Sequence, residues 1–179
     1  MTLSVAKRPP TQTTTTTQTR TQTTTTTAPG GGVGTAAPAP TPKTATVPDV
    51  TGQSANDAAH ALARQGILAS IVFVASDDPL GTVEQQAKSS GATVPYHSHV
   101  QINVSSGPNA STTEQVPSVI GSTLQQAVTA LNRAHLRLIY VKLAVPRAQA
   151  GKIVQQSPLP GGRAPANAQV LVFLGAFKG

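Results

Sequence analysis

The sequence predicts an α+β protein made of two tandem small units, each with one helix packed on a roughly three-stranded sheet, behind a disordered Thr/Pro-rich tail. Three observations predict this: a repeat, apolar spacing that changes from helical to alternating within each copy, and a low-complexity N-terminal segment. We divide the 179 residues into a tail (1–46), a first copy (47–105), a linker (106–115) and a second copy (116–179).

The repeat is clearest in its two openings, Val-Pro-Asp-Val-Thr-Gly from Val47 and Val-Pro-Ser-Val-Ile-Gly from Val116. Further matches at the same offset of 69 positions are Ala58 with Ala127, Ala61 with Ala130, Leu62 with Leu131 and Arg64 with Arg133. From Gly81 and Gly151 onward the copies match at an offset of 70. A unit of about 60 residues is marginally stable alone. Since the chain has no cysteine, contact between the copies is one source of further stability.

The tail at 1–46 is a Thr-rich run followed by Gly-rich and Pro-rich segments. It has too little apolar surface to offset the entropy of ordering a chain, roughly 1–2 kcal/mol per residue. Mixtures of threonine and proline are typical of stalks. We therefore interpret this segment as a spacer; the alternative is a disordered tail without a role.

In the first copy, Pro48 is expected to keep the residue before it extended, and Ser54 is expected to be the N-cap of a helix. Apolar residues then follow helical spacing at Ala55, Ala58, Ala59 and Leu62. Gly66 is expected to end the helix. Strands are expected at 67–74, 82–86 and 100–104, where β-branched or alternating apolar residues occur.

The second copy repeats this plan, with Ser122 or Thr123 as the N-cap. Its predicted apolar helix stripe is Leu124, Ala127, Val128 and Leu131, and its predicted strands are 136–143, 151–156 and 170–174. The segment from 105 to 115 is polar and contains Gly107-Pro108. We expect it to be a linker and not part of a shared core.

The net charge of +7 is unevenly distributed. The first copy has two basic and five acidic residues, whereas the second has seven basic residues and no acid. Nucleic-acid binding is not expected, because aromatic residues make up only 3% of the chain and no known nucleic-acid motif occurs. No apolar run reaches the ~18 residues that cross a bilayer. The opening residues are too short for a signal peptide, so the chain is either cytosolic or a piece of a longer exported protein.

The repeated pattern resembles the PASTA repeat of penicillin-binding proteins and bacterial serine/threonine kinases. The likeness rests on Val-Pro-x-Val-x-Gly, the capped Ala/Leu helix and the later Gly-x-Val/Ile-x-x-Gln. The second copy also has the family's Gln-x-Pro-x-x-Gly as Gln156 to Gly161, whereas the first has Ala87 and Lys88 after Gln86. The resemblance implies an extracellular, non-catalytic module that binds peptidoglycan or muropeptides, as the sensing or targeting part of such a kinase or penicillin-binding protein.

Five cations are candidate ligand-binding residues. Arg64 and Arg133 take equivalent places near the helix ends, where each is either a clamp for a stem-peptide carboxylate or a favourable charge at the negative helix end. Arg147, Lys152 and Arg163 are expected in loops or at strand ends of the basic copy. They form either a patch for anionic wall polymers or ordinary solvated charges.

No catalytic constellation is apparent, since cysteine and a Gly-x-Ser-x-Gly motif are both absent. Asp77 and Asp78 are interpreted as solvated loop charges. His97 and His99 would share one side of a strand, but no further metal ligand lies nearby in the sequence, so no metal or cofactor is expected. The alternative to wall binding is a structural spacer or dimerisation module, with weak self-association and no ligand.

Overall fold

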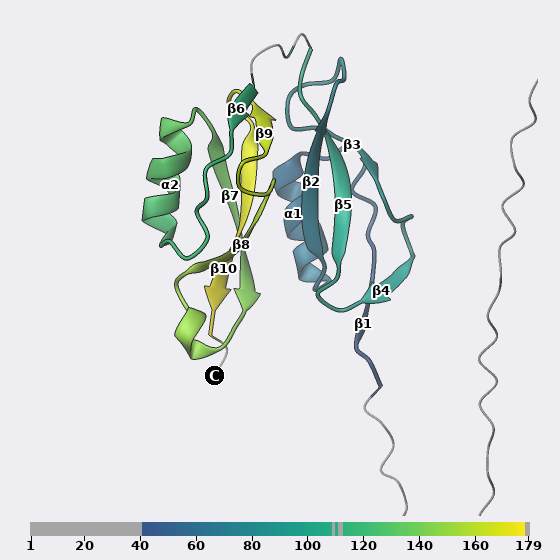
Figure 1. The fold of residues 1–179 in the computed structure, drawn as a ribbon. Coiled ribbons are helices and arrows are strands. Elements are labelled where there is room, and N and C mark those ends of the chain that lie inside the picture. The colour runs from purple at the N-terminus through teal and green to yellow at the C-terminus, as the bar shows by residue number, and fades with distance from the viewer. Residues whose placement is uncertain (1–40, 109, 111–112, 178–179) are drawn as a thin grey trace, which may run out of the picture. The chain divides into compact units, whose positions relative to one another are not determined.

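The computed structural model describes residues 41–108, 110 and 113–177, and the predicted tail up to residue 40 lies outside this part of the chain. The elements are β1 (Thr44–Thr46), α1 (Ala55–Arg64), β2 (Leu68–Val74), β3 (Val83–Gln86), β4 (Thr93–Pro95), β5 (His99–Ser105), β6 (Thr113–Gln115), α2 (Leu124–Arg133), β7 (Arg137–Ala144), the 3-10 turn η1 (Arg147–Gln149), β8 (Ile153–Ser157), β9 (Arg163–Pro165) and β10 (Gln169–Ala176). Figure 1 shows them as two helix-and-sheet units, which confirms the predicted fold class.

Each copy contains a three-stranded sheet with the same topology. The last strand is central: β5 pairs parallel with β2 and antiparallel with β3, and β10 pairs in the same way with β7 and β8. Two short antiparallel ladders, β1 with β4 and β6 with β9, were not predicted. Their strands have three residues each, which is too few for an alternating pattern to stand out in the sequence.

The helices begin and end at residues that satisfy their free backbone groups. Ser54 Oγ accepts a hydrogen bond from Asp57 N at 3.2 Å. Of the two candidates in the second copy, Thr123 is the cap, and Thr123 N donates to Gln126 Oε1 at 3.0 Å in a capping box. Gly66 follows α1 with φ +77°, and a Cβ there would collide with the Tyr96 ring. Glycine is therefore required at this position for both its backbone angle and its small size.

The glutamine shared by both copies forms hydrogen bonds that join the Val-Pro opening of each copy to its sheet. Gln156 is buried; its Oε1 accepts from Val119 N at 2.8 Å, and its Nε2 donates to Pro117 O at 3.0 Å. In the first copy, Gln86 makes the matching bonds to Val50 N at 2.9 Å and to Pro48 O at 3.2 Å. The glutamine and the Val-Pro opening thus belong to one structural motif, because each satisfies the other's polar groups.

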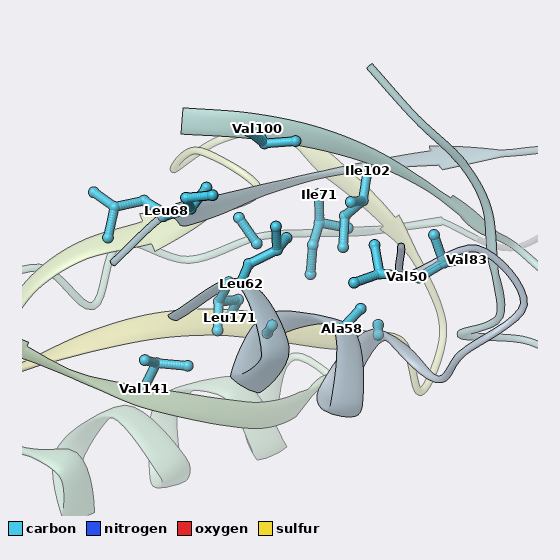
Figure 2. Close-up of a cluster of buried hydrophobic side chains, with 14 of the residues drawn as sticks. Val50, Ala58, Leu62, Leu68, Ile71, Val83, Val100, Ile102, Val141 and Leu171 are labelled. Atoms are coloured by element: carbon cyan, nitrogen blue, oxygen red, sulfur yellow. The ribbon is translucent and has the colours of Figure 1, made fainter. Parts of the chain in front are cut away.

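The buried apolar side chains form two clusters. One is built on α2 and the inner face of the second sheet, with Leu131, Leu136 and Val170 among its members. The other surrounds α1, and it also contains four residues from β7 and β10 of the second copy: Ile139, Val141, Leu171 and Phe173. Figure 2 shows Val141 and Leu171 in this cluster together with Ala58 and Leu62 of α1. The two copies therefore bury apolar surface against each other.

The predicted stripe on α1 is confirmed, since Ala55, Ala58, Ala59 and Leu62 are all buried. On α2 the prediction is wrong for Val128, which is 38% exposed, whereas its counterpart Ala59 is 1% exposed. The difference arises because α1 contacts β7 and β10 of the second copy as well as β2 of its own. None of the helices in the described ranges is long and apolar enough to cross a membrane.

Candidate ligand-binding surface

All five predicted cations lie on the surface. Arg64 and Arg133 are in the last turns of α1 and α2, Arg147 begins η1, Lys152 precedes β8, and Arg163 begins β9. Each is exposed. The structure does not gather them into one cleft, because Arg133 and Lys152 line separate grooves. The five cations can therefore act together only by attracting anions over a distance. Direct contact with a ligand is considered separately for each groove.

Arg133 lies in a groove of about 320 Å³ on the outer face of α2. The other lining residues are Gln125, Gln126, Thr129 and Ala130. Gln125, Thr129 and Arg133 are spaced four residues apart, so they form one row along the helix. Thr129 Oγ1 donates to Gln125 O at 3.1 Å, and Gln126 is held in the capping box. The row offers amide, hydroxyl and guanidinium groups without an acid, which suits a ligand that has hydroxyls and a carboxylate.

The equivalent helix face in the first copy has a different charge. The row itself becomes Asn56, His60 and Arg64, and an acid lies next to it. There Asp57 takes the place of Gln126, and its Oδ2 accepts a hydrogen bond from Ser54 Oγ at 2.7 Å. A carboxylate bound at Arg64 would therefore meet an acidic residue on the same helix. Although Arg64 and Arg133 are equivalent by sequence, the surroundings favour Arg133 as the binding residue.

The three remaining cations are dispersed over the second copy. Arg163 Nη1 donates to Thr113 Oγ1 at 3.2 Å. The Arg147 guanidinium carbon lies 5.9 Å from the centre of the Phe177 ring. Lys152 lines a shallow groove of about 290 Å³ with Ile120 and Val154 among its neighbours. These positions suit long-range attraction of a polyanion better than a defined site.

An apolar groove of about 450 Å³ lies where the two copies meet, and sequence reasoning missed it. Three of its lining side chains are well exposed, Val72 at 41%, Ile120 at 48% and Leu159 at 73%. Two hydrogen bonds join the copies beside it: Ile71 N donates to Ser157 Oγ at 2.7 Å, and His99 Nε2 lies 3.2 Å from Gln155 Oε1. The available signal was Ser157, because its counterpart in the first copy is Ala87.

The histidines and acids considered as metal or acid/base groups have other surroundings. His97 lies in a turn with φ +64°, and its ring centre is 4.2 Å from that of Tyr96. Asp77 and Asp78 are exposed in the loop between β2 and β3. Within the described residues, no group of three or more His, Cys, Asp or Glu side chains is placed to hold a metal ion.

Comparison with known families gives two matches along the chain. The model of the PASTA domain matches residues 45–106 and 114–176, which together are more than half of the 179 residues. The matched ranges include both helices and both three-stranded sheets. No curated protein matches the chain.

Solved structures similar to the chain come from two classes of protein, Ser/Thr kinases and a penicillin-binding protein. The extracellular region of the Ser/Thr kinase PrkC from Staphylococcus aureus is 17% identical, with a TM-score of 0.34, over 75% of this chain and 48% of that one. A three-PASTA-domain fragment of a Ser/Thr kinase from the same species is 22% identical, with a TM-score of 0.33, over 73% and 67%. Penicillin-binding protein 2X from Streptococcus thermophilus is 16% identical, with a TM-score of 0.31, over 74% and 17%. The chain thus spans about half of the first of these structures.

Proposed function

Because the chain belongs to the PASTA domain family, we propose that it is a non-catalytic, extracellular cell-wall module whose second copy binds peptidoglycan or its muropeptide fragments. PASTA domains are binding modules that occur in the extracellular regions of bacterial kinases and penicillin-binding proteins. The chain would then serve as the sensing or targeting part of such a protein. Its division into a first copy at 47–105, a linker at 106–115 and a second copy at 116–179 is part of this proposal.

The observation that carries the proposal is the row of Gln125, Thr129 and Arg133 on α2. Wall fragments present sugar hydroxyls, amides and stem-peptide carboxylates, and this row offers a partner for each. The guanidinium can hold a carboxylate with two parallel hydrogen bonds. Because residues 116–179 contain no acidic side chain, no acid on α2 itself repels the carboxylate. The other four cations, Arg64, Arg147, Lys152 and Arg163, would add attraction toward anionic wall polymers.

A pull-down with purified cell-wall sacculi tests the proposal on the full chain. The wild-type chain should sediment with sacculi, and the bound fraction should fall as salt is raised. Arg133→Gln should reduce binding several-fold, whereas the matched variant Arg64→Gln should reduce it little, since only the helix of Arg64 has an acid, Asp57, on it. Absence of sedimentation at low salt would refute wall binding. Equal losses in both variants would refute the assignment of Arg133.

A structural spacer or dimerisation module without ligand is the second candidate. The apolar groove between the copies favours it, because Val72, Ile120 and Leu159 are all exposed there and exposed apolar patches commonly mark protein contacts. Sedimentation velocity over a concentration series would detect weak self-association. Leu159→Asp should abolish it without affecting sacculus binding. A monomer at all concentrations would remove this candidate.

A further inference from the structure

The outer edge of β7 has backbone groups that point away from its sheet. β7 is an edge strand, since the strand order is β7-β10-β8. Arg137 N donates to Ala168 O at 2.9 Å, and Val145 N donates to Ala176 O at 3.0 Å. In a parallel ladder, alternate residues of a strand face the neighbouring strand. The N–H and C=O groups of Leu138, Tyr140 and Lys142 therefore face outward.

The equivalent edge of the first copy is already occupied. Leu68 N donates to Ser98 O at 2.9 Å, so the backbone of Ile71 faces away from β5. Ile71 N donates instead to Ser157 Oγ of the second copy at 2.7 Å, in a buried bond. Tyr140 follows Ile71 by 69 positions and is its counterpart. Tyr140 is 42% exposed whereas Ile71 is 3% exposed, so the edge that is covered in the first copy is open in the second.

A groove of about 530 Å³ runs beside this open edge. It is lined by Leu138, Ile139, Tyr140 and Lys142 of β7 and by Asn56 and His60 of α1. Its volume is in the range of about 300–1,000 Å³ that is usual for ligand sites. The outward backbone groups and the groove thus coincide, because Leu138, Tyr140 and Lys142 belong to both.

The charge around the groove selects the kind of ligand. Lys142 is in the lining, and Arg137 begins the same strand. The one acid on α1, Asp57, is not in the lining and is bonded to Ser54 at the helix N-cap. Asn56 and His60 offer side-chain donors opposite the strand. A ligand with backbone-like amides and at least one carboxylate would complement these groups.

We propose that the outer edge of β7 is a strand-addition site for a short extended peptide that carries carboxylates. The peptide backbone pairs with Leu138, Tyr140 and Lys142, a carboxylate lies near Lys142 Nζ, and Asn56 and His60 flank the peptide from α1. Strand addition takes its affinity from main-chain hydrogen bonds and its selectivity from the side chains beside them. This deepens the proposed function, on which it rests for the source of the peptide: the stem peptide of the wall is short and bears carboxylates.

Amide hydrogen exchange followed by NMR on the full chain tests the site directly. The probe is an acetylated Ala-Glu-Ala-Glu-Ala peptide, in which alternate glutamates share one side of a strand. We expect exchange at the Tyr140 amide to slow about tenfold when the peptide is bound. The same peptide with alternate backbone nitrogens methylated keeps its charge but loses its donors, and it should not bind. Binding of the methylated peptide, or shifts confined to α2, would overturn the proposal.

Two variants test the two halves of the site. Tyr140→Pro removes the outward N–H, and an edge strand tolerates proline where the N–H faces solvent; peptide affinity should fall about tenfold. Lys142→Gln should weaken binding and lower its salt dependence while sensitivity to peptide methylation persists. If Tyr140→Pro does not fold, the comparison of the methylated and unmethylated peptides still tests whether backbone pairing is required for binding.

The site and the proposed function can fail separately. If Tyr140→Pro folds and still binds the acidic peptide as well as the wild type, the site is refuted whatever the sacculus assay shows. If the peptide protects Tyr140 but sacculi do not bind the chain, the site stands, and its natural ligand is a carboxylate-bearing peptide of another source. A synthetic stem peptide in the same exchange experiment separates these sources, since only a wall-directed site should prefer it over the Ala/Glu probe.

Discussion

The two copies share a fold but differ on the outer faces of their sheets. In the second copy this face has Ile139, Val141, Leu171 and Phe173, which are buried in the cluster around α1. The first copy has Ser70, Val72, Gln101 and Asn103 at the equivalent positions. Val72 is 41% exposed, and Gln101 Nε2 donates to Asn103 Oδ1 at 2.9 Å on the surface. One sheet therefore faces a neighbouring helix and the other faces water, although both use the same topology.

The difference shows how a repeat adapts to its place in a chain. The inner face of each sheet must be apolar in every copy, because it packs on its own helix. Within the described residues, the outer face is apolar where the other copy covers it and largely polar where it is exposed. α1 shows the matching change, with the small residue Ala59 where α2 has Val128.

The largest expected effect comes from truncating the covered face. Leu171→Ala should lower the free energy of unfolding by about 2–5 kcal/mol, because Leu171 is fully buried and the site cannot collapse completely. Urea unfolding of the full chain measures this. The matched variant Gln101→Ala, at the equivalent exposed position, should change stability by less than about 0.5 kcal/mol. Similar values for the two would mean that the outer faces do not differ in burial.

The next effect comes from exchanging the helix residues. Ala59→Val adds two methyl groups where the second sheet approaches α1, and overpacking of this kind costs about 1–3 kcal/mol. The reverse exchange, Val128→Ala, removes an exposed side chain and should change the unfolding free energy by less than about 0.5 kcal/mol. Thermal unfolding of both variants compares them. A neutral Ala59→Val would show that α1 is not closely packed against the second copy.

A smaller loss is expected at the hydrogen bond between the copies. Ser157→Ala leaves the buried N–H of Ile71 without its acceptor, at a cost of about 1–2 kcal/mol. Exchange of the Ile71 amide should accelerate in this variant, which NMR detects residue by residue. Ala87→Ser places the same hydroxyl on the exposed counterpart in the first copy and should leave exchange unchanged. Unaltered protection of Ile71 in Ser157→Ala would contradict the bond.

The smallest effect distinguishes two interpretations of the helix-end arginines. If Arg64 and Arg133 only oppose the helix dipole, replacing either by Gln should cost about 0.3–1 kcal/mol in stability and nothing else. Denaturation of the two variants should give equal small losses, because both residues lie in a last helical turn. Loss of sacculus binding in Arg133→Gln alone, at unchanged relative stability, would establish the difference between the copies.

Much of each copy could be predicted from local patterns. Local signals in the sequence predict the cap at Ser54, the stop at Gly66 and the helical spacing of alanine and leucine. For the second helix they left Ser122 and Thr123 as alternative caps, and the structure shows that Thr123 is the cap. Contact between the copies was visible only indirectly. The second copy ends with Val170-Leu171-Val172-Phe173, an uninterrupted apolar run that indicates a strand buried on both faces. The first copy has the alternating Val100-Gln101-Ile102-Asn103 instead.

The candidate sites were less predictable for a physical reason. Arg133 stood out as a charge at a helix end, but its favourable surroundings depend on Gln126, which is ordinary in the sequence. The groove beside β7 joins His60 of one copy to Tyr140 and Lys142 of the other. No spacing rule within a single copy can bring these together, since their proximity depends on how α1 packs on the second sheet.

The polar outer face of the first sheet also constrains how such genes can change. A crossover that exchanged the two copies would place Leu171 and Phe173 at the positions of Gln101 and Asn103, on a sheet face where Val72 and Gln101 are exposed. The rearranged protein would keep the caps and the helical spacing of each copy, but it would expose an apolar sheet face to solvent. The outer-face side chains therefore fix the order of the two copies along the chain. We expect a protein with the copies exchanged to aggregate, whether or not it still binds its ligand.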